Sequence, residues 1–209
     1  MIENKILEIL KNKNMKIQEK SEILGWSTDK FYQNIYDMDG NVVQESYDIE
    51  QYDLKDILRG ETLEGKTVLD LGCNCGSYLF EALKLGAKKV IGVDKQDCMS
   101  KFIKHLGVTD RAEFYKQDIL KYDSSPVEIT FIIDVLAYLS NNEIEYLIDK
   151  MKSYTKEKIY IVDMFSRNYA HQYNIVIDKL ERDKTKYEIY KFNHRDRFDV
   201  KVIEIRGDE

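Results

Sequence analysis

The sequence has little of what marks secreted, membrane-spanning or linker-rich proteins. Its 209 residues include one proline and three cysteines. No apolar run approaches the roughly 18 residues that a membrane span needs. Three cysteines cannot all pair with one another, which favours free thiols in a reducing compartment. The first 20 residues carry charges throughout, unlike a signal peptide. We therefore expect a cytoplasmic protein with no disulfide scaffold and no proline-rich linker.

The sequence also lacks an excess of basic residues. Lys and Arg number 32 against 38 Asp and Glu, which gives a formal net charge of -6. A bulk basic footprint for nucleic acid is therefore missing, although a local basic patch remains open. Hydrophobic residues make up 43% and charged residues 33%, an ordinary globular composition. At roughly 100–200 residues per domain, this length predicts one domain with a small appendage.

The appendage is expected to be an N-terminal extension over residues 1–60. Apolar residues recur at helical spacing within residues 1–20. Asp39-Gly40 then separates two short runs, which is typical of a β-hairpin with a two-residue turn. Residues 48–60 should form a short helix that ends at its terminal glycine. The extension either packs on the edge of the domain or serves as a lid over a site.

From residue 61 to residue 209, short apolar strands alternate with helices. Strands are expected at 67–72, 89–94, 112–118, 128–134 and 158–165, and helices at 77–86, 97–107, 141–154 and 166–184. Two further strands close the chain as a hairpin. This alternation predicts βαβ units, and therefore a parallel sheet with right-handed crossovers into which the hairpin inserts one antiparallel strand.

Acidic residues fall at the carboxyl ends of these expected strands, where ligands bind in an open parallel sheet. One such acid is usually a helix cap. Five of them in register beside a glycine-containing turn favour a ligand site instead. The five acids are Asp70, Asp94, Asp118, Asp134 and Asp163.

The turn Gly72-Cys73-Asn74-Cys75-Gly76 differs from the phosphate-binding loops. A dinucleotide fingerprint would have glycine where Asn74 and Ser77 stand, and no P-loop motif occurs anywhere in the chain. The glycine missing at Asn74 is the one that lets a backbone approach a pyrophosphate, which suggests a cofactor without one. Asp94, about 20 residues beyond this turn, is placed to bind ribose hydroxyls.

Four spaced segments together resemble the motifs of class I S-adenosylmethionine-dependent methyltransferases. They are D-L-G-C-N-C-G (70–76), G-V-D (92–94), K-Q-D-I (116–119) and D-V-L-A-Y-L (134–139). The resemblance covers about residues 60–165 and returns in the final hairpin. It implies an α/β fold with a Rossmann-like, seven-stranded and mostly parallel sheet. Helices would cover both faces, and residues 61–209 would form the domain that binds S-adenosylmethionine.

The same resemblance assigns residues to that cofactor. Asp70, Gly72 and Gly76 would surround its methionine part, and Asp94 would bind the ribose. Asp118 would accept from the adenine amino group. The implied cofactor-binding set is Asp70, Gly72, Cys73, Asn74, Gly76, Asp94, Lys95, Gln117, Asp118, Ile119 and Asp134. Of these, Ile119 would pack on the adenine ring and Asp134 would stand near the methionine ammonium. Carboxylates suit the ammonium, diol and amine of the cofactor as strong acceptors.

The acceptor side offers weaker signals. His171, Tyr138 and Asp163 are candidates for a general base or orienting group, since methyl transfer needs chiefly alignment of the acceptor with the methyl carbon. His194 lies in a charged turn that is either solvated or holds an anionic group. Aromatic side chains of the extension would form either a lid or simple packing; they are Trp26, Phe31, Tyr32, Tyr36 and Tyr47. No metal is expected, because Cys73-Asn74-Cys75 lacks ordinary zinc spacing.

Three functions stay open at this point. The acidic charge, and the absence of an N-P-P-Y motif for base amino groups, favour a small polar acceptor, such as a hydroxyl of a sugar, a nucleotide-sugar or another metabolite. The alternative is an RNA or protein acceptor, because residues 65–94 also resemble the branch that contains a wobble-uridine tRNA modifying enzyme. The third is a non-catalytic, cofactor-binding or scaffold subunit. No membrane partner is expected.

Overall fold

The computed structural model describes residues 52–97, 99–100, 103, 108, 110–164, 170–194 and 198–207. It also describes short pieces of the extension, at 8, 12, 14–16, 19–20, 35–36 and 42–44. Of the described residues within the predicted helix over 1–20, residues 8 and 19–20 are helical and residues 12 and 14–16 are not. Most of the predicted helix over 97–107 lies outside the described residues. Within the described ranges, no helix is both long and apolar enough to cross a membrane.

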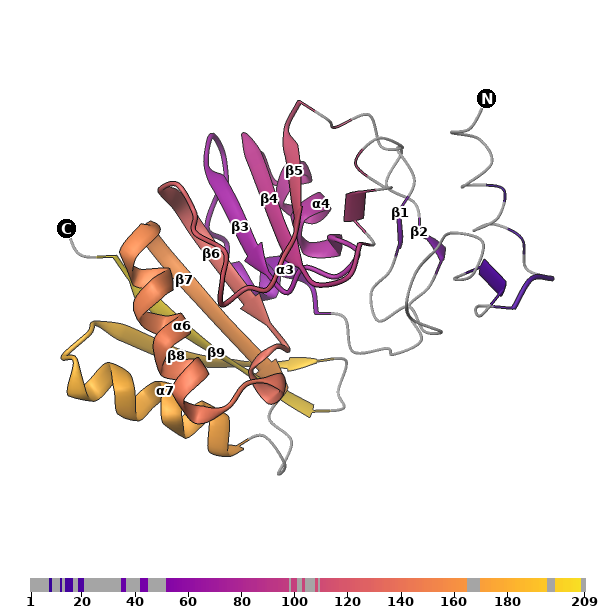
Figure 1. Ribbon diagram of the computed structural model, residues 1–209. Helices are drawn as coiled ribbons and strands as arrows, with labels where there is room; N and C mark the ends of the chain where they lie inside the picture. The colour runs from indigo at the N-terminus through magenta and orange to yellow at the C-terminus, as the bar shows by residue number, and fades with distance from the viewer. Residues whose placement is uncertain are drawn as a thin grey trace.

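A seven-stranded sheet forms the centre of the molecule, in the order β5-β4-β3-β6-β7-β9-β8 (Figure 1). Its parallel strands are β3 (Thr67–Leu71), β4 (Lys89–Asp94), β5 (Ala112–Lys116), β6 (Val127–Ile133) and β7 (Thr155–Met164). β9 (Phe198–Arg206) runs antiparallel to both β7 and β8 (Tyr187–His194). The predicted Rossmann-like α/β sheet with its closing hairpin is confirmed. The strand order reverses direction between β3 and β6, the position where such sheets bind ligands.

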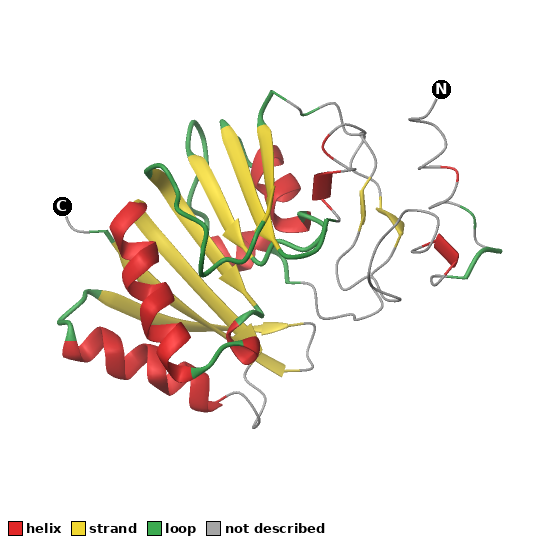
Figure 2. Cartoon of the chain, viewed as in Figure 1, coloured by secondary structure: helices red, strands yellow, loops and turns green. Residues whose placement is uncertain are grey.

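Helices cover both faces of this sheet (Figure 2). α3 (Leu54–Leu58) and α4 (Ser77–Lys84) lie on one face, and α6 (Asn141–Tyr154) and α7 (Ala170–Arg182) on the other. The division follows from strand periodicity: Val68 packs with the α3 and α4 side, and its neighbour Leu69 packs with the α6 and α7 side.

α6 shows how the sequence specifies one of these helices. Ser140 and Glu143 form a reciprocal capping box at its start. The helical stripe of Ile144, Leu147 and Ile148 that follows is buried against the sheet.

Several predicted boundaries differ from the observed ones. The helix expected over 48–60 is observed at Leu54–Leu58. It ends earlier than expected because Arg59, one residue before Gly60, takes the left-handed conformation with φ 51°. β7 begins at Thr155, directly after α6 and earlier than expected. β5 ends at Lys116 and β6 at Ile133, so Asp118 and Asp134 follow their strands rather than end them.

The predicted hairpin in the extension is present as β1 (Ile35–Tyr36) and β2 (Val42–Gln44), which pair antiparallel. Ile35 faces Gln44, the register that a two-residue turn at Asp39-Gly40 would give, but Tyr36 faces Val42. The register therefore shifts by one residue between the two pairs, which the alternation in the sequence did not indicate.

Candidate functional site

The turn after β3 is held against the end of β4 by backbone hydrogen bonds. The N–H groups of Gly72 and Cys73 both donate to the carbonyl of Val93, at 2.8 and 3.2 Å. Gly76 N–H donates back to the carbonyl of Cys73 at 2.7 Å, which closes the turn just before α4. Asn74 has a φ of 47°, and Gly72 and Gly76 have φ values of 88° and 78°, so the turn uses the left-handed region three times.

Gly72 allows this turn to pass close to the end of β6. A Cβ atom at Gly72 would lie 2.4 Å from Cγ2 of Val135, the residue that follows Asp134. Glycine is therefore required at position 72 for two reasons: a side chain would collide with Val135, and the backbone has a positive φ. The carboxyl ends of β3 and β6 are close together at this point, where the sheet reverses its strand order.

Asp94 ties the turn to the end of β4. Its Oδ2 accepts from the N–H of Asn74 at 2.9 Å, and its Oδ1 accepts from the N–H of Gln96 at 2.8 Å. Each carboxylate oxygen keeps a second lone pair, so the group can still accept from a ligand diol. The Asp94 carbonyl accepts from Gln117 N–H at 2.9 Å, and this bond attaches the loop after β5.

That loop carries the next acid, Asp118. Its carboxylate accepts from Leu120 N–H at 3.1 Å and lies 3.3 Å from the ammonium of Lys95. Burial alone would raise the pKa of Asp118, but the Leu120 N–H and Lys95 outweigh burial and hold the pKa below its ordinary value. Asp118 is thus a charged acceptor beside the buried side chain of Ile119.

Asp70 is the most deeply buried of the five acids, with 1% of its surface exposed. Burial, followed by the nearby charge of Asp94, raises its pKa to about 8. Its Oδ2 has no hydrogen-bond partner among the described residues. A buried carboxyl oxygen in this state fits a ligand that brings a donor or a positive charge.

Asp134 extends from the end of β6 with a φ of 55°, and its N–H donates to the Val162 carbonyl at 2.9 Å. Its Oδ1 accepts a hydrogen bond of 2.9 Å from the hydroxyl of Tyr52, which is 1% exposed. Sequence reasoning missed Tyr52. The two residues lie 82 positions apart, and nothing in the residues around Tyr52 indicates a partner at the end of β6.

The three candidates for acid–base work stand on separate elements. Asp163 is 7% exposed near the end of β7. Because Ile133 pairs with Val162 in parallel strands, Asp134 and Asp163 each follow a member of that pair and lie on neighbouring chain segments. Tyr138 is 82% exposed on η1 (Leu136–Tyr138), which packs against α7. His171 is exposed near the start of α7. The three candidates therefore lie on three consecutive parts of the chain: Tyr138 on η1, Asp163 on β7 and His171 on α7.

Other predicted site residues lie outside what the structure describes. These are the side chain of His194 and the aromatic side chains of the extension that were expected to form a lid or packing. Cys73 and Cys75 are both buried, and Cys73 Sγ lies 3.8 Å from Met99 Sδ. Within the described part of the chain, no three His, Cys, Asp or Glu side chains are grouped to hold a metal ion.

Comparison with known proteins shows which proteins this chain is similar to. Residues 68–158 match the model of a family described as a methyltransferase domain. A ribosomal protein L11 methyltransferase of Enterobacter sp. is 43% identical over 74 residues, which are 32% of this chain and 25% of that protein. This chain therefore matches only about a quarter of that relative's length.

Solved structures show the same fold at low identity. Magnesium protoporphyrin IX methyltransferase from Synechocystis PCC 6803 with bound SAM superposes with a TM-score of 0.56 and 18% identity, over 74% of this chain and 76% of that one. The N-methyltransferase NodS from Bradyrhizobium japonicum WM9 gives a TM-score of 0.59 and 15% identity, over 75% of this chain and 92% of that one.

Proposed function

We propose that this chain, which belongs to the class I S-adenosylmethionine-dependent methyltransferases, transfers a methyl group to a hydroxyl of a small polar acceptor. The by-product is S-adenosylhomocysteine. The observation that carries the proposal is the set of five acids at or near the carboxyl ends of neighbouring strands around the switch point of the sheet. Asp70 among them keeps a buried carboxyl oxygen without a partner in the described residues.

The residues of this site fit S-adenosylmethionine. Asp94 has lone pairs left for the ribose diol, and Asp118 is a charged acceptor suited to the adenine amino group. Asp70 and Asp134 are the acids for the methionine end. The close approach of Gly72 to Val135 leaves no room for a side chain at position 72. We assign the full set that the family motifs imply, Cys73, Asn74, Gly76, Lys95, Gln117 and Ile119 included, to cofactor binding.

When bound, the cofactor supplies an electrophilic methyl group on a sulfonium. An acceptor oxygen that attacks this carbon forms one C–O bond as the C–S bond breaks, and the acceptor proton must move to a base. Asp163, Tyr138 and His171 are our candidates for accepting or orienting that proton. His171 and Tyr138 are both exposed, so either can pass a proton on to solvent, whereas Asp163 is buried. The rest of the rate enhancement comes from alignment within the site.

The acidic character of the site supports a small polar acceptor over RNA. The charged carboxylates at this edge of the sheet, in a chain of net charge -6, would repel a phosphate backbone. A macromolecular acceptor remains the second candidate. The observation that favours it is the local identity to the ribosomal protein L11 methyltransferases, of 43% over 74 residues in the Enterobacter protein.

The proposal is tested with methyl-labelled S-adenosylmethionine, purified protein and a cell extract separated into small molecules, RNA, polysaccharide and protein. Label in the small-molecule or polysaccharide fraction is expected. Label in RNA that is lost on nuclease treatment, or label in the protein fraction, would replace our acceptor with the second candidate. Bound cofactor with no label in any fraction would favour a cofactor-binding subunit.

Once an acceptor is found, the candidate bases can be tested one at a time by substitution. His171→Ala should greatly lower turnover while the affinity for S-adenosylhomocysteine is kept. Unchanged turnover would remove His171 from the list and leave Asp163→Asn and Tyr138→Phe as the next variants.

A further inference from the structure

We propose that Tyr52 is a positioning residue of this site, which donates to Oδ1 of Asp134 and so orients this carboxylate toward the ammonium end of the cofactor. The inference rests on the proposed function, because it gives Asp134 a ligand. It goes beyond the family motifs, since Tyr52 precedes the first of them by 18 residues and belongs to the segment that enters the domain.

The Tyr52 hydroxyl can act only as a donor toward Asp134. The phenol is 1% exposed, and its oxygen lies 2.9 Å from Asp134 Oδ1. Burial, together with the negative charge of Asp134, raises the pKa of Tyr52 far above its ordinary value. The hydroxyl therefore stays protonated, and because a carboxylate has no proton to give, the direction of this hydrogen bond is settled.

The hydrogen bond from Tyr52 restrains the orientation of the Asp134 side chain. Asp134 is exposed, it follows the last residue of β6, and its backbone is in the left-handed region at φ 55°. A carboxylate at an exposed strand end is free to rotate about its side-chain torsions unless another group restrains it. A charge-assisted bond from a buried donor supplies that restraint and selects one oxygen for it.

Tyr52 is itself fixed on the side of α4 and β8. Its N–H donates to the Tyr78 hydroxyl at 3.2 Å, and the next turn is attached where Leu54 N–H donates to Glu81 Oε2 at 3.3 Å. The ring of Phe192, on β8, meets the Tyr52 ring edge-on, with centroids 6.0 Å apart and an interplanar angle of 80°. The hydroxyl thus has little freedom to follow Asp134 if that side chain turns away.

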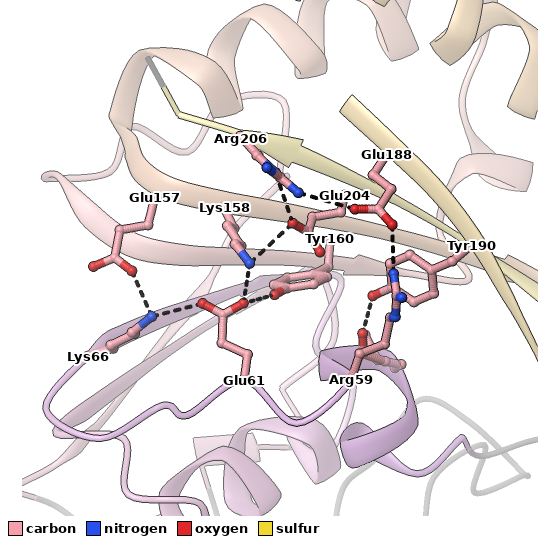
Figure 3. Close-up of polar contacts among 11 residues, drawn as sticks. Arg59, Glu61, Lys66, Glu157, Lys158, Tyr160, Glu188, Tyr190, Glu204 and Arg206 are labelled. Carbon is pink, nitrogen blue, oxygen red and sulfur yellow. Dashed lines mark hydrogen bonds and ion pairs between the residues drawn. The ribbon is translucent and has the colours of Figure 1, made fainter. Parts of the chain in front are cut away.

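The far end of the same segment is anchored by a charged cluster with residues of β7, β8 and β9 (Figure 3). Glu61 contacts the Lys158 ammonium and the Tyr160 hydroxyl, each at 2.5 Å, and the Lys66 ammonium at 3.0 Å. Arg59 pairs with Glu188 at 2.8 Å. Residues 52–61 are therefore attached at both ends, and only the Tyr52 end reaches the site.

Each end of this segment is thus held by a hydrogen bond between a tyrosine hydroxyl and a carboxylate, one at the site and one remote from it. This pair supplies a matched experiment. Tyr52→Phe removes the hydroxyl that contacts Asp134, and Tyr160→Phe removes the buried hydroxyl that contacts Glu61. Both variants lose the same group from the same type of side chain, so a general loss of stability is common to both.

Affinity is measured by calorimetry with two ligands: S-adenosylhomocysteine, and 5′-methylthioadenosine, which lacks the amino-acid part. Tyr52→Phe should weaken S-adenosylhomocysteine binding about tenfold, as expected for a hydrogen bond to a charged group. Its affinity for 5′-methylthioadenosine should stay within about twofold. Tyr160→Phe should leave both affinities within about twofold of the parent protein.

The outcomes that overturn the inference are distinct from failure of the proposed function. Equal affinities of Tyr52→Phe and the parent protein for S-adenosylhomocysteine, or an equal loss for both ligands, would show that Tyr52 does not act on the amino-acid end. If the parent protein binds neither ligand, the proposed function itself fails.

A double-mutant cycle keeps the inference testable if Tyr52→Phe is unstable. In an Asp134→Ala background, Tyr52→Phe should cost no further affinity for S-adenosylhomocysteine, because the group that it positions is already gone. An additive loss would overturn the inference.

Discussion

The Asp94 carboxylate accepts the backbone N–H of Asn74 at 2.9 Å and so joins the end of β4 to the turn after β3. One side chain therefore both shapes the turn and, in our proposal, binds the ribose. Asp94→Ala should largely abolish binding of S-adenosylhomocysteine, because it removes the carboxylate that binds the ribose and also the hydrogen bond that holds the turn. Calorimetry checks this, with Asp123→Ala as the control, since the Asp123 side chain is 90% exposed. Unchanged affinity of Asp94→Ala would refute the assignment.

The close approach at Gly72 predicts a specific cost for a single methyl group. Gly72→Ala should lower the free energy of unfolding by roughly 2–5 kcal/mol, which combines a left-handed φ with overpacking against Val135. Gly65→Ala is the matched control, because Gly65 also has a positive φ, of 73°, but nothing lies within 4 Å of its added Cβ. It should cost only about 1–2 kcal/mol. Urea unfolding of both variants measures the difference, and equal costs would contradict the close approach.

Asp70 predicts a pH dependence of stability. Its pKa is about 8 in the folded chain against an ordinary value of 3.8, so between about pH 4 and 8 the folded state keeps a proton that the unfolded state has lost. Stability contributed by this group is complete below pH 4 and falls by up to about 1.4 kcal/mol per pH unit as the pH rises toward 8. Asp70→Asn should flatten that fall. Unfolding of both proteins from pH 5 to 8 tests this, and parallel curves would argue against it.

The Glu61 cluster of Figure 3 predicts a stability difference between two acids that share one lysine. Lys66 pairs with Glu61, whose side chain is 17% exposed, and with Glu157, which is 43% exposed. Glu61→Gln should cost roughly 1–3 kcal/mol, because Lys158 and Lys66 both lose a well-shielded partner. Glu157→Gln should cost at most about 1 kcal/mol. Thermal unfolding at matched salt compares them, and an equal cost would show that the cluster adds little.

The same cluster should weaken in acid. Burial would raise the pKa of Glu61, but hydrogen bonds from Lys158, Tyr160 and Lys66 outweigh burial and lower it. A depressed folded pKa means that the stabilisation is present above the ordinary pKa of 4.5 and is lost as the pH falls through the lower folded value. Unfolding of Glu61→Gln and its parent below pH 5 should therefore converge. A constant gap down to pH 2 would contradict the lowered pKa.

Local sequence was enough to predict the parallel half of the sheet, and it indicated a candidate site at the carboxyl ends of those strands. The apolar run before Gly72, the acid at the end of each expected strand and the stripe of α6 are set by periodicity, capping and turn chemistry, which act over a few residues. The motif spacing from Asp70 to Asp134 then indicated a methyltransferase, and residues 68–158 match the model of a methyltransferase domain. Boundaries were less accurate, as where Arg59 ends α3 before Gly60.

Contacts between distant residues needed the tertiary structure. The raised pKa of Asp70 depends on burial and on Asp94 across a strand pair, and no property of residue 70 alone reveals it. Tyr52 meets Asp134 across 82 residues, and Glu61 meets Tyr160 across 99. Local patterns determine which elements form and which of their faces are apolar. Which polar side chains meet at the ends of those elements depends on how the layers pack, and that is decided only in the folded chain.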